Sequence, residues 1–150
     1  MGDPTEGTGG TLVTGRGSPP RKKKQSLHLE IPMKPLSTNK MYSGVKRRSV
    51  YYKRFSREVF QYLNENYDPR GLSLKGNLRF TLEIGVSSPL FDASNSIKAI
   101  EDIIVKWSGS FDDRQVYSLH VEKYLVNKGE EYMKLSFTKL RSNRDRRYKR

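Results

Sequence analysis

The 150-residue sequence contains no cysteine, and no hydrophobic run approaches the roughly 18 residues that a membrane-spanning helix needs. Without cysteine there is no disulfide, no thiolate nucleophile and no cysteine-ligated zinc. The N-terminus also lacks the apolar stretch of a secretory signal peptide. These absences predict an intracellular protein that does not enter a membrane.

Several catalytic motifs are missing too. The chain has no P-loop, no dinucleotide-binding glycine motif and no serine–histidine–aspartate order, so nucleotide hydrolysis and acyl transfer gain no support. We expect no small-molecule cofactor. The two histidines, His28 and His120, fall on predicted strands at opposite ends of the fold without the spacing of a metal site. We therefore assign both histidines a structural role.

Positive charge is what the sequence has in excess, with a net charge of +13 at pH 7. Residues 68–138 carry nine basic and ten acidic residues, so the flanking segments supply the whole excess. Such a distribution favours a polyanionic partner, because each neutralised phosphate releases counterions. The alternative is a basic surface that only keeps the protein soluble.

The composition divides the chain into three parts. Residues 1–26 are rich in glycine, proline, serine and threonine, which predicts a disordered basic arm. Its "PPRKKK" stretch fits either a nuclear import signal or a phosphate-binding tail. Residues 27–140 are long enough for one folded domain but not for two. Residues 141–150 form a basic tail.

Alternating apolar residues predict four strands: 27–33, 78–86, 117–126 and 131–140. Pro32 marks either an edge strand or the end of its strand, because proline cannot donate to a sheet ladder. The tight "NKGE" loop at 127–130 predicts a hairpin between the last two strands.

Apolar residues at helical spacing predict two amphipathic helices. The stripe of the first, over residues 50–66, is Tyr52, Phe55, Val59, Tyr62 and Leu63. The stripe of the second is Ile97, Ile100, Ile104 and Trp107, with Ser94 or Asn95 as its N-cap. The order β-α-β-α-β-β predicts an α+β fold with a small mixed or antiparallel sheet packed against the two helices.

Acidic residues gather around the second predicted helix: Asp92, Glu101, Asp102, Asp112 and Asp113. Converging carboxylates repel one another unless a cation neutralises them, and oxygen ligands suit Mg²⁺. Such a metal site could support phosphodiester cleavage. The alternative is ordinary turn and capping chemistry for Asp92 and the Asp112–Asp113 pair, with Glu101 and Asp102 solvated on the helix.

Eight residues of this segment form an ordered set: Asp92, Asn95, Lys98, Asp102, Asp112, Asp113, Gln115 and Val116. The set resembles the RusA family of Holliday junction resolvases, whose pattern is Asp-x-Asp-Asn-x-x-Lys, a helix with an internal Asp, then Phe-x-x-Asp-Asp-x-Gln-Val. Phe111 stands one place before the acidic pair instead of three. The resemblance runs from Leu27 to Leu140 and includes "LEIPMKPLSTNKMY" at the start of the domain.

The resemblance implies a Mg²⁺-dependent endonuclease, with Mn²⁺ as a substitute, that resolves four-way DNA junctions by paired symmetric nicks. It makes Asp92 and Asp113 metal ligands, Lys98 a contact to the phosphate or to the attacking water, and Asp112 an assisting acid. Ser94 occupies the position of the family's second acid and can offer the metal only a neutral oxygen, so metal affinity should fall. The alternative is therefore a branched-DNA-binding protein with little or no catalysis.

The predicted DNA contacts come from the loop before the first helix, from the start of that helix and from the motif itself: Lys40, Tyr42, Lys46, Arg47, Arg48, Lys53, Arg54 and Asn95. Cations at a helix N-terminus oppose the helix dipole, and an arriving anion would offset that cost. Tyr42 could stack on a base.

Two equivalent cuts in a two-fold symmetric junction predict a homodimer. The family resemblance favours the cytoplasm of a bacterium and a phage or prophage origin, whereas the basic arm leaves a nuclear location open. A third function, RNA binding, is favoured by charge alone.

Overall fold

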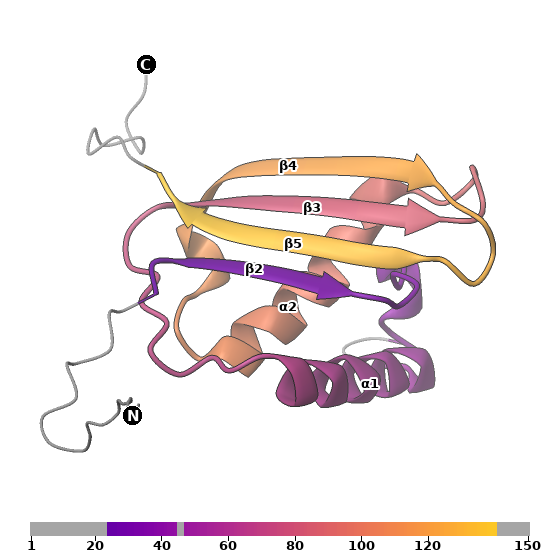
Figure 1. Ribbon diagram of the computed structural model, residues 1–150. Coiled ribbons are helices and arrows are strands. Elements are labelled where there is room, and N and C mark those ends of the chain that lie inside the picture. The colour runs from indigo at the N-terminus through magenta and orange to yellow at the C-terminus, as the bar shows by residue number, and fades with distance from the viewer. Residues whose placement is uncertain (1–23, 45–46, 141–150) are drawn as a thin grey trace, which may run out of the picture.

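The computed structural model describes residues 24–44 and 47–140. Most of the predicted arm, the basic tail and Lys46 therefore lie outside the described residues. The observed elements are β2 (Ser26–Ile31), α1 (Val50–Asn66), β3 (Leu78–Val86), α2 (Ile97–Ser108), β4 (Val116–Leu125) and β5 (Tyr132–Lys139). The predicted α+β class and element order are confirmed (Figure 1).

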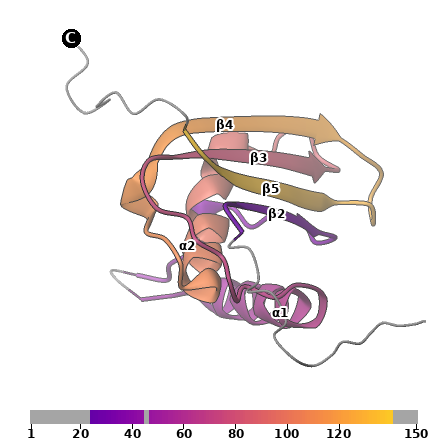
Figure 2. The same ribbon diagram turned by 60° about the vertical axis from the view of Figure 1, so that its left-hand side comes forward.

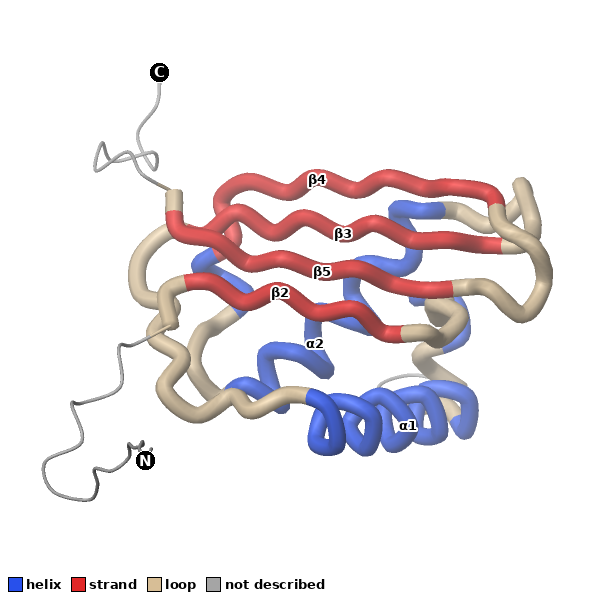
Figure 3. Tube along the Cα trace, viewed as in Figure 1, coloured by secondary structure: helices blue, strands red, loops and turns tan. Residues whose placement is uncertain are grey.

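The four strands form one mixed sheet in the order β2-β5-β3-β4 (Figure 3). β5 pairs antiparallel with both β2 and β3, whereas β3 and β4 are parallel. β2 is an edge strand that ends at Ile31, so Pro32 lies just beyond its end, as predicted. Lys24 is already held against the fold, because its backbone N–H donates to the Gly71 carbonyl over 2.9 Å.

The predicted hairpin of the last two strands is wrong, because β3 lies between β4 and β5. The loop at 127–130 carries the chain past the end of β3 instead of joining paired neighbours. Every second residue of β3 between Leu78 and Val86 is fully or almost fully buried, which suits a central strand. β4 is exposed along most of its length, which suits an edge strand.

Both helices lie on the same side of the sheet (Figures 1 and 2). α1 buries Phe55, Val59 and Leu63, and its bounds match the predicted 50–66. α2 buries Ile100 and Ile104 between the sheet and α1 as its apolar spacing predicts. No helix in the described part of the chain is long and apolar enough to cross a membrane.

Two contacts fix the position of α2 and of the turn after it. The Trp107 indole N–H donates to the Asn64 side-chain oxygen of α1 over 3.0 Å, which ties the two helices together. Gly109 ends α2 with φ of 62°, a left-handed conformation that glycine adopts without strain. The buried Phe111 ring then packs on Phe137 of β5, with ring centroids 4.6 Å apart. This anchor holds the turn that carries Asp112 and Asp113.

Candidate functional site

Asp92 organises the turn between β3 and α2. Its carboxylate caps a short 3-10 helix, Ala93–Ser96, by accepting hydrogen bonds from the Ser94 N–H over 3.0 Å and the Ser94 hydroxyl over 2.7 Å. Its second oxygen accepts from the Asn95 side chain over 3.2 Å. The Ser94 hydrogen bonds hold the pKa of Asp92 below its ordinary value, so this carboxyl is ionised.

The predicted N-cap of α2 is therefore wrong. Neither Ser94 nor Asn95 caps the α-helix. Ser96 occupies the N-cap position of α2 and makes no side-chain capping bond. The reason is the extra 3-10 turn, which moves the start of α2 to Ile97 and turns the Ser94 and Asn95 side chains back toward Asp92. The observed contacts of Asp92 are those of a turn and capping residue, which was the alternative to a metal ligand.

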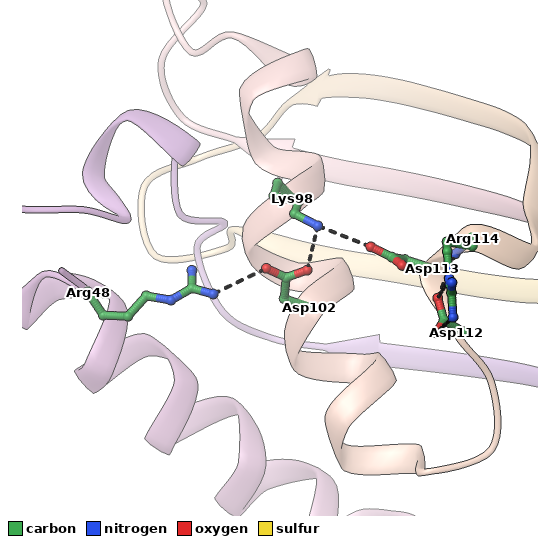
Figure 4. A network of polar contacts seen from close by, with 6 residues as sticks. All are labelled: Arg48, Lys98, Asp102, Asp112, Asp113 and Arg114. Atoms are coloured by element: carbon green, nitrogen blue, oxygen red, sulfur yellow. Dashed lines mark hydrogen bonds and ion pairs between the residues drawn. The ribbon is translucent and has the colours of Figure 1, made fainter. Parts of the chain in front are cut away.

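A chain of alternating charges crosses the face of α2 (Figure 4). The Lys98 ammonium lies 2.9 Å from the Asp102 carboxylate, one turn further along α2, and 3.2 Å from the carboxylate of Asp113. The other oxygen of Asp102 lies 3.5 Å from the Arg48 guanidinium. The hydrogen bond to Asp102 is the main reason why the pKa of Lys98 is raised, with Asp113 adding to it. Lys98 is therefore a permanent cation between two carboxylates.

Asp112 has a local structural role. Its carboxylate accepts a hydrogen bond from the Arg114 N–H, and its own N–H donates to the Gln115 side chain over 2.8 Å, which completes a capping box. The Arg114 guanidinium binds the same carboxylate and holds the pKa of Asp112 well below its usual range. Gln115 also donates to the carbonyls of Leu74 and Gly76 over 2.9 Å each. Asp112 and Gln115 thus stabilise the turn before β4, and the observed contacts of Asp112 are with Arg114 and Gln115 and not with Asp92.

Glu101 and Asp102 are not the solvated helix residues that the alternative reading of the acids expected. Glu101 is only 9% exposed, and its carboxylate makes no hydrogen bond or ion pair with any described residue. Burial raises its pKa to about 7, although the nearby Lys98 charge opposes this shift. Asp102 is half-buried and holds Lys98 and Arg48 together. The sequence did not predict the burial of Glu101, because a glutamate on a helix is normally solvated.

The structure brings Lys98 and Asp113 together, but none of the interactions among the described residues joins Asp92 to Asp113. Asp92 follows the C-terminal end of β3, where Lys123 near the end of β4 donates to the carbonyls of Pro89 and Phe91. Asp113 precedes Val116 of β4, which pairs with the first residue of β3. Asp92 thus comes after the C-terminal end of β3. Asp113 comes just before the N-terminal end of β4, which lies at the other end of this parallel pair of strands.

The donor set that the resemblance implies for Mg²⁺ does not fit a preformed site. Within residues 24–44 and 47–140 no group of three or more histidine, aspartate or glutamate side chains is arranged to hold a metal ion. Asp92 binds the Ser94–Asn95 turn, Asp113 binds Lys98, and Ser94 offers a hydroxyl that is donated to Asp92. Mg²⁺ needs several oxygens in near-octahedral array, which these contacts do not provide.

The predicted DNA contacts divide into inward and outward residues. The Arg48 guanidinium packs between the rings of Tyr42 and Tyr52, with centroid distances of 4.9 and 4.4 Å, and pairs with Asp102. One of its nitrogens is buried and has no hydrogen-bond partner among residues 24–44 and 47–140. Arg48 and Asn95 thus already have internal contacts, whereas Lys40, Arg47, Lys53 and Arg54 are exposed. Tyr42 is 44% exposed, with Arg48 against its ring.

Besides Arg47, five exposed cations lie along α1 and the described part of the segment before it. Lys53 and Arg57 are one turn apart on α1, and Arg54 is next to them on the same surface. Arg54 lines one cavity together with Lys34 and Lys40. Among the described residues none of the five forms an ion pair. We call this set, Lys34, Lys40, Lys53, Arg54 and Arg57, the basic face.

Two cations of the basic face, Lys34 and Arg57, and the neighbouring Tyr51 were not among the predicted contacts. Lys34 belongs to the basic face because it lines the same cavity as Lys40 and Arg54. Tyr51 is 56% exposed, and the Lys40 ammonium lies 5.6 Å from its ring centroid. The periodicity of α1 could have placed Tyr51 outside, because the buried residues Phe55, Val59 and Leu63 lie on a different face.

No protein-family model matches this chain, and no curated protein matches it with significance.

Proposed function

We propose that the protein binds branched DNA, including four-way junctions, through the basic face. The observation that carries the proposal is a set of five exposed cations without acidic partners among the described residues. Unpaired cations on one surface repel one another, and phosphates would relieve that repulsion while releasing counterions.

The start of α1 supports an anionic partner. Ser49 caps the helix by accepting the Tyr52 N–H over 3.0 Å, and the first turn contains no acidic residue. Lys53 and Arg54 follow close behind, where the helix dipole disfavours positive charge. A DNA phosphate at this end would interact favourably with both the dipole and the side chains.

Anisotropy titrations with a labelled four-way junction test the binding. We expect the double variant Lys53→Ala/Arg57→Ala to bind on the order of tenfold more weakly, because two phosphate contacts are lost. The matched control, Lys75→Ala/Lys106→Ala, removes the same charge away from the basic face and should bind like the native protein. An equal loss of affinity in both variants would mean that binding depends on net charge alone and not on the basic face. Tighter binding of duplex RNA than of the junction would favour RNA binding as the function.

A second candidate function is metal-dependent cleavage of such junctions by a homodimer. The specific observation in its favour is the 3.2 Å ion pair between Lys98 and Asp113, which the RusA-like motif assigns to one site. The ionised Asp92 carboxylate also suits this chemistry. Because Asp113 is bound by Lys98 and Asp92 by its own turn, cleavage would require these contacts to be rearranged.

Incubating the protein with a junction in Mg²⁺ or Mn²⁺ tests this second candidate. Paired, symmetric nicks that Asp113→Asn abolishes would support the endonuclease. A shifted junction band that forms without a metal and yields no product would leave DNA binding as the function. Asp68→Asn, which alters an exposed aspartate paired with Arg70 outside the motif, serves as the matched control.

A further inference from the structure

A cavity of about 470 Å³ opens between the segment 34–40 and the first turns of α1. Pro35 and Phe55, both buried, contribute apolar surface to it. Phe91, the residue directly before Asp92, lines it from the turn after β3. The cavity therefore lies between the basic face and the turn that Asp92 organises, and its volume is within the range of small-molecule sites.

Three of the residues that line this cavity carry positive charge. Lys34, Lys40 and Arg54 are exposed, and none forms an ion pair within the described part of the chain. The cavity also has an exposed aromatic ring, because Tyr51 lines it and is 56% accessible. Glu58, one turn beyond Arg54, is the acid among the lining residues. Cations, ring faces and one carboxylate acceptor are thus concentrated around one hollow.

These groups match the parts of a single nucleotide. A phosphate is recognised by lysine and arginine, and a base stacks on an aromatic ring whatever its sequence. The carboxylate of Glu58 can accept a hydrogen bond from the N–H groups of a base edge but would repel a second phosphate. A base inside a paired duplex presents no free ring face to such a hollow, so the ligand must be unpaired.

We propose that this cavity binds one unpaired nucleotide of a DNA substrate, with the base against Tyr51 and Phe91 and its phosphates against Lys34, Lys40 and Arg54. The inference rests on the proposed DNA-binding function and deepens it, because it makes an unpaired or opened strand the preferred substrate. Binding there would hold the neighbouring phosphate beside the Asp92 turn, since Phe91 belongs to both.

Two labelled DNA duplexes, one fully paired and one with a single unpaired 2-aminopurine nucleotide, test the inference on the full-length protein. We expect tighter binding of the second duplex and quenching of the 2-aminopurine fluorescence as its base stacks. Tyr51→Ala should lower the preference for the unpaired duplex by roughly tenfold, the order expected for one lost stacking contact. Tyr51→Phe should keep the preference, because the ring remains.

The matched control is Tyr117→Ala, which removes an exposed tyrosine from β4, away from the cavity. Equal affinity of the native protein for both duplexes, or an equal loss of preference in the two alanine variants, would overturn the inference while leaving DNA binding intact. Competition by a free deoxynucleoside monophosphate as strong as by the unpaired duplex would also overturn it. Failure to bind any DNA would instead reject the proposed function itself.

Discussion

Lys98 is the residue on which the local electrostatics of α2 depend. Its ammonium separates the carboxylates of Asp102 and Asp113, which would otherwise repel each other across a partly buried space. Asp102 in turn gives Arg48 its one anionic partner among the described residues. The arrangement gives these acids a local role in a basic protein, because Asp102 and Asp113 neutralise the half-exposed Lys98, and Asp102 also neutralises Arg48.

Glu101 gives a testable pH dependence at the same scale. Its pKa rises from an ordinary 4.5 to about 7 on folding, so the folded state binds a proton more tightly than the unfolded chain. The stability associated with the neutral carboxyl is therefore complete below pH 4.5 and is lost as the pH rises through 7. We expect Glu101→Gln to match the native protein at pH 4 and to be more stable by roughly 1–3 kcal/mol at pH 8.

Urea denaturation at several pH values measures this difference. Glu65→Gln, at an exposed position on α1, is the matched control and should show no such trend. Identical stabilities of Glu101→Gln and the native protein at pH 8 would mean that the ionised Glu101 carboxylate is well solvated, contrary to its burial.

At this scale the sequence predicted some partners and missed others. The RusA-like motif implied a common site for Lys98 and Asp113, and these two side chains form an ion pair. The burial of Glu101 could not be predicted, because a glutamate on a helix is normally solvated and only the packing of α2 against its neighbours decides otherwise. The contacts of Asp92 could not be predicted either, because the spacing of residues in a sequence does not determine the direction in which a side chain points.

At the level of elements, the helices were predictable and the strand order was not. α1 has the predicted bounds because Ser49 caps its start and its apolar stripe continues to Leu63. The hairpin prediction failed because β4 and β5 each carry a strand pattern, and a pattern does not say which strand is the neighbour. The parallel crossover through α2 places β4 beside β3, and β5 then pairs on the other side of β3.

Gly85 provides a prediction for the sheet. It pairs across strands with Tyr132, and a Cβ atom at Gly85 would overlap Cε1 of that ring. The ring has little freedom to move, because the Tyr132 hydroxyl donates to the Glu83 carboxylate over 2.6 Å. We expect Gly85→Ala to destabilise the protein by about 1–3 kcal/mol in thermal or urea unfolding, as overpacking does.

Removing the ring gives the control for this prediction. In the Tyr132→Ala background, Gly85→Ala should cost much less, because the added methyl group then has space. The same cost in both backgrounds would locate the effect in the backbone rather than in the contact with Tyr132.

The whole molecule separates its charges by position. The basic face lies on α1 and the segment before it, whereas Asp102, Asp112 and Asp113 near α2 are already paired with Arg48, Lys98 or Arg114. A surface of this kind attracts polyanions over a distance that salt shortens.

Salt dependence therefore measures how many of these cations contact phosphate. The logarithm of the DNA-binding constant should fall linearly with the logarithm of salt concentration for the native protein. We expect Lys53→Ala to reduce the magnitude of that slope by about 1, because one phosphate contact is removed. Lys75→Ala should leave the slope unchanged, and an equal change in both variants would contradict a localised basic face.

The sequence by itself determined the α+β class, the order of six elements, the buried stripes of both helices and the excess of positive charge. These properties follow from local periodicity and composition, which the linear chain carries directly. Only the tertiary structure decided that β3 separates β4 from β5, that Arg48 points inward, and that Glu101 is buried. Those outcomes depend on which surfaces pack together across long stretches of chain, and packing is a property of the folded arrangement rather than of any one segment.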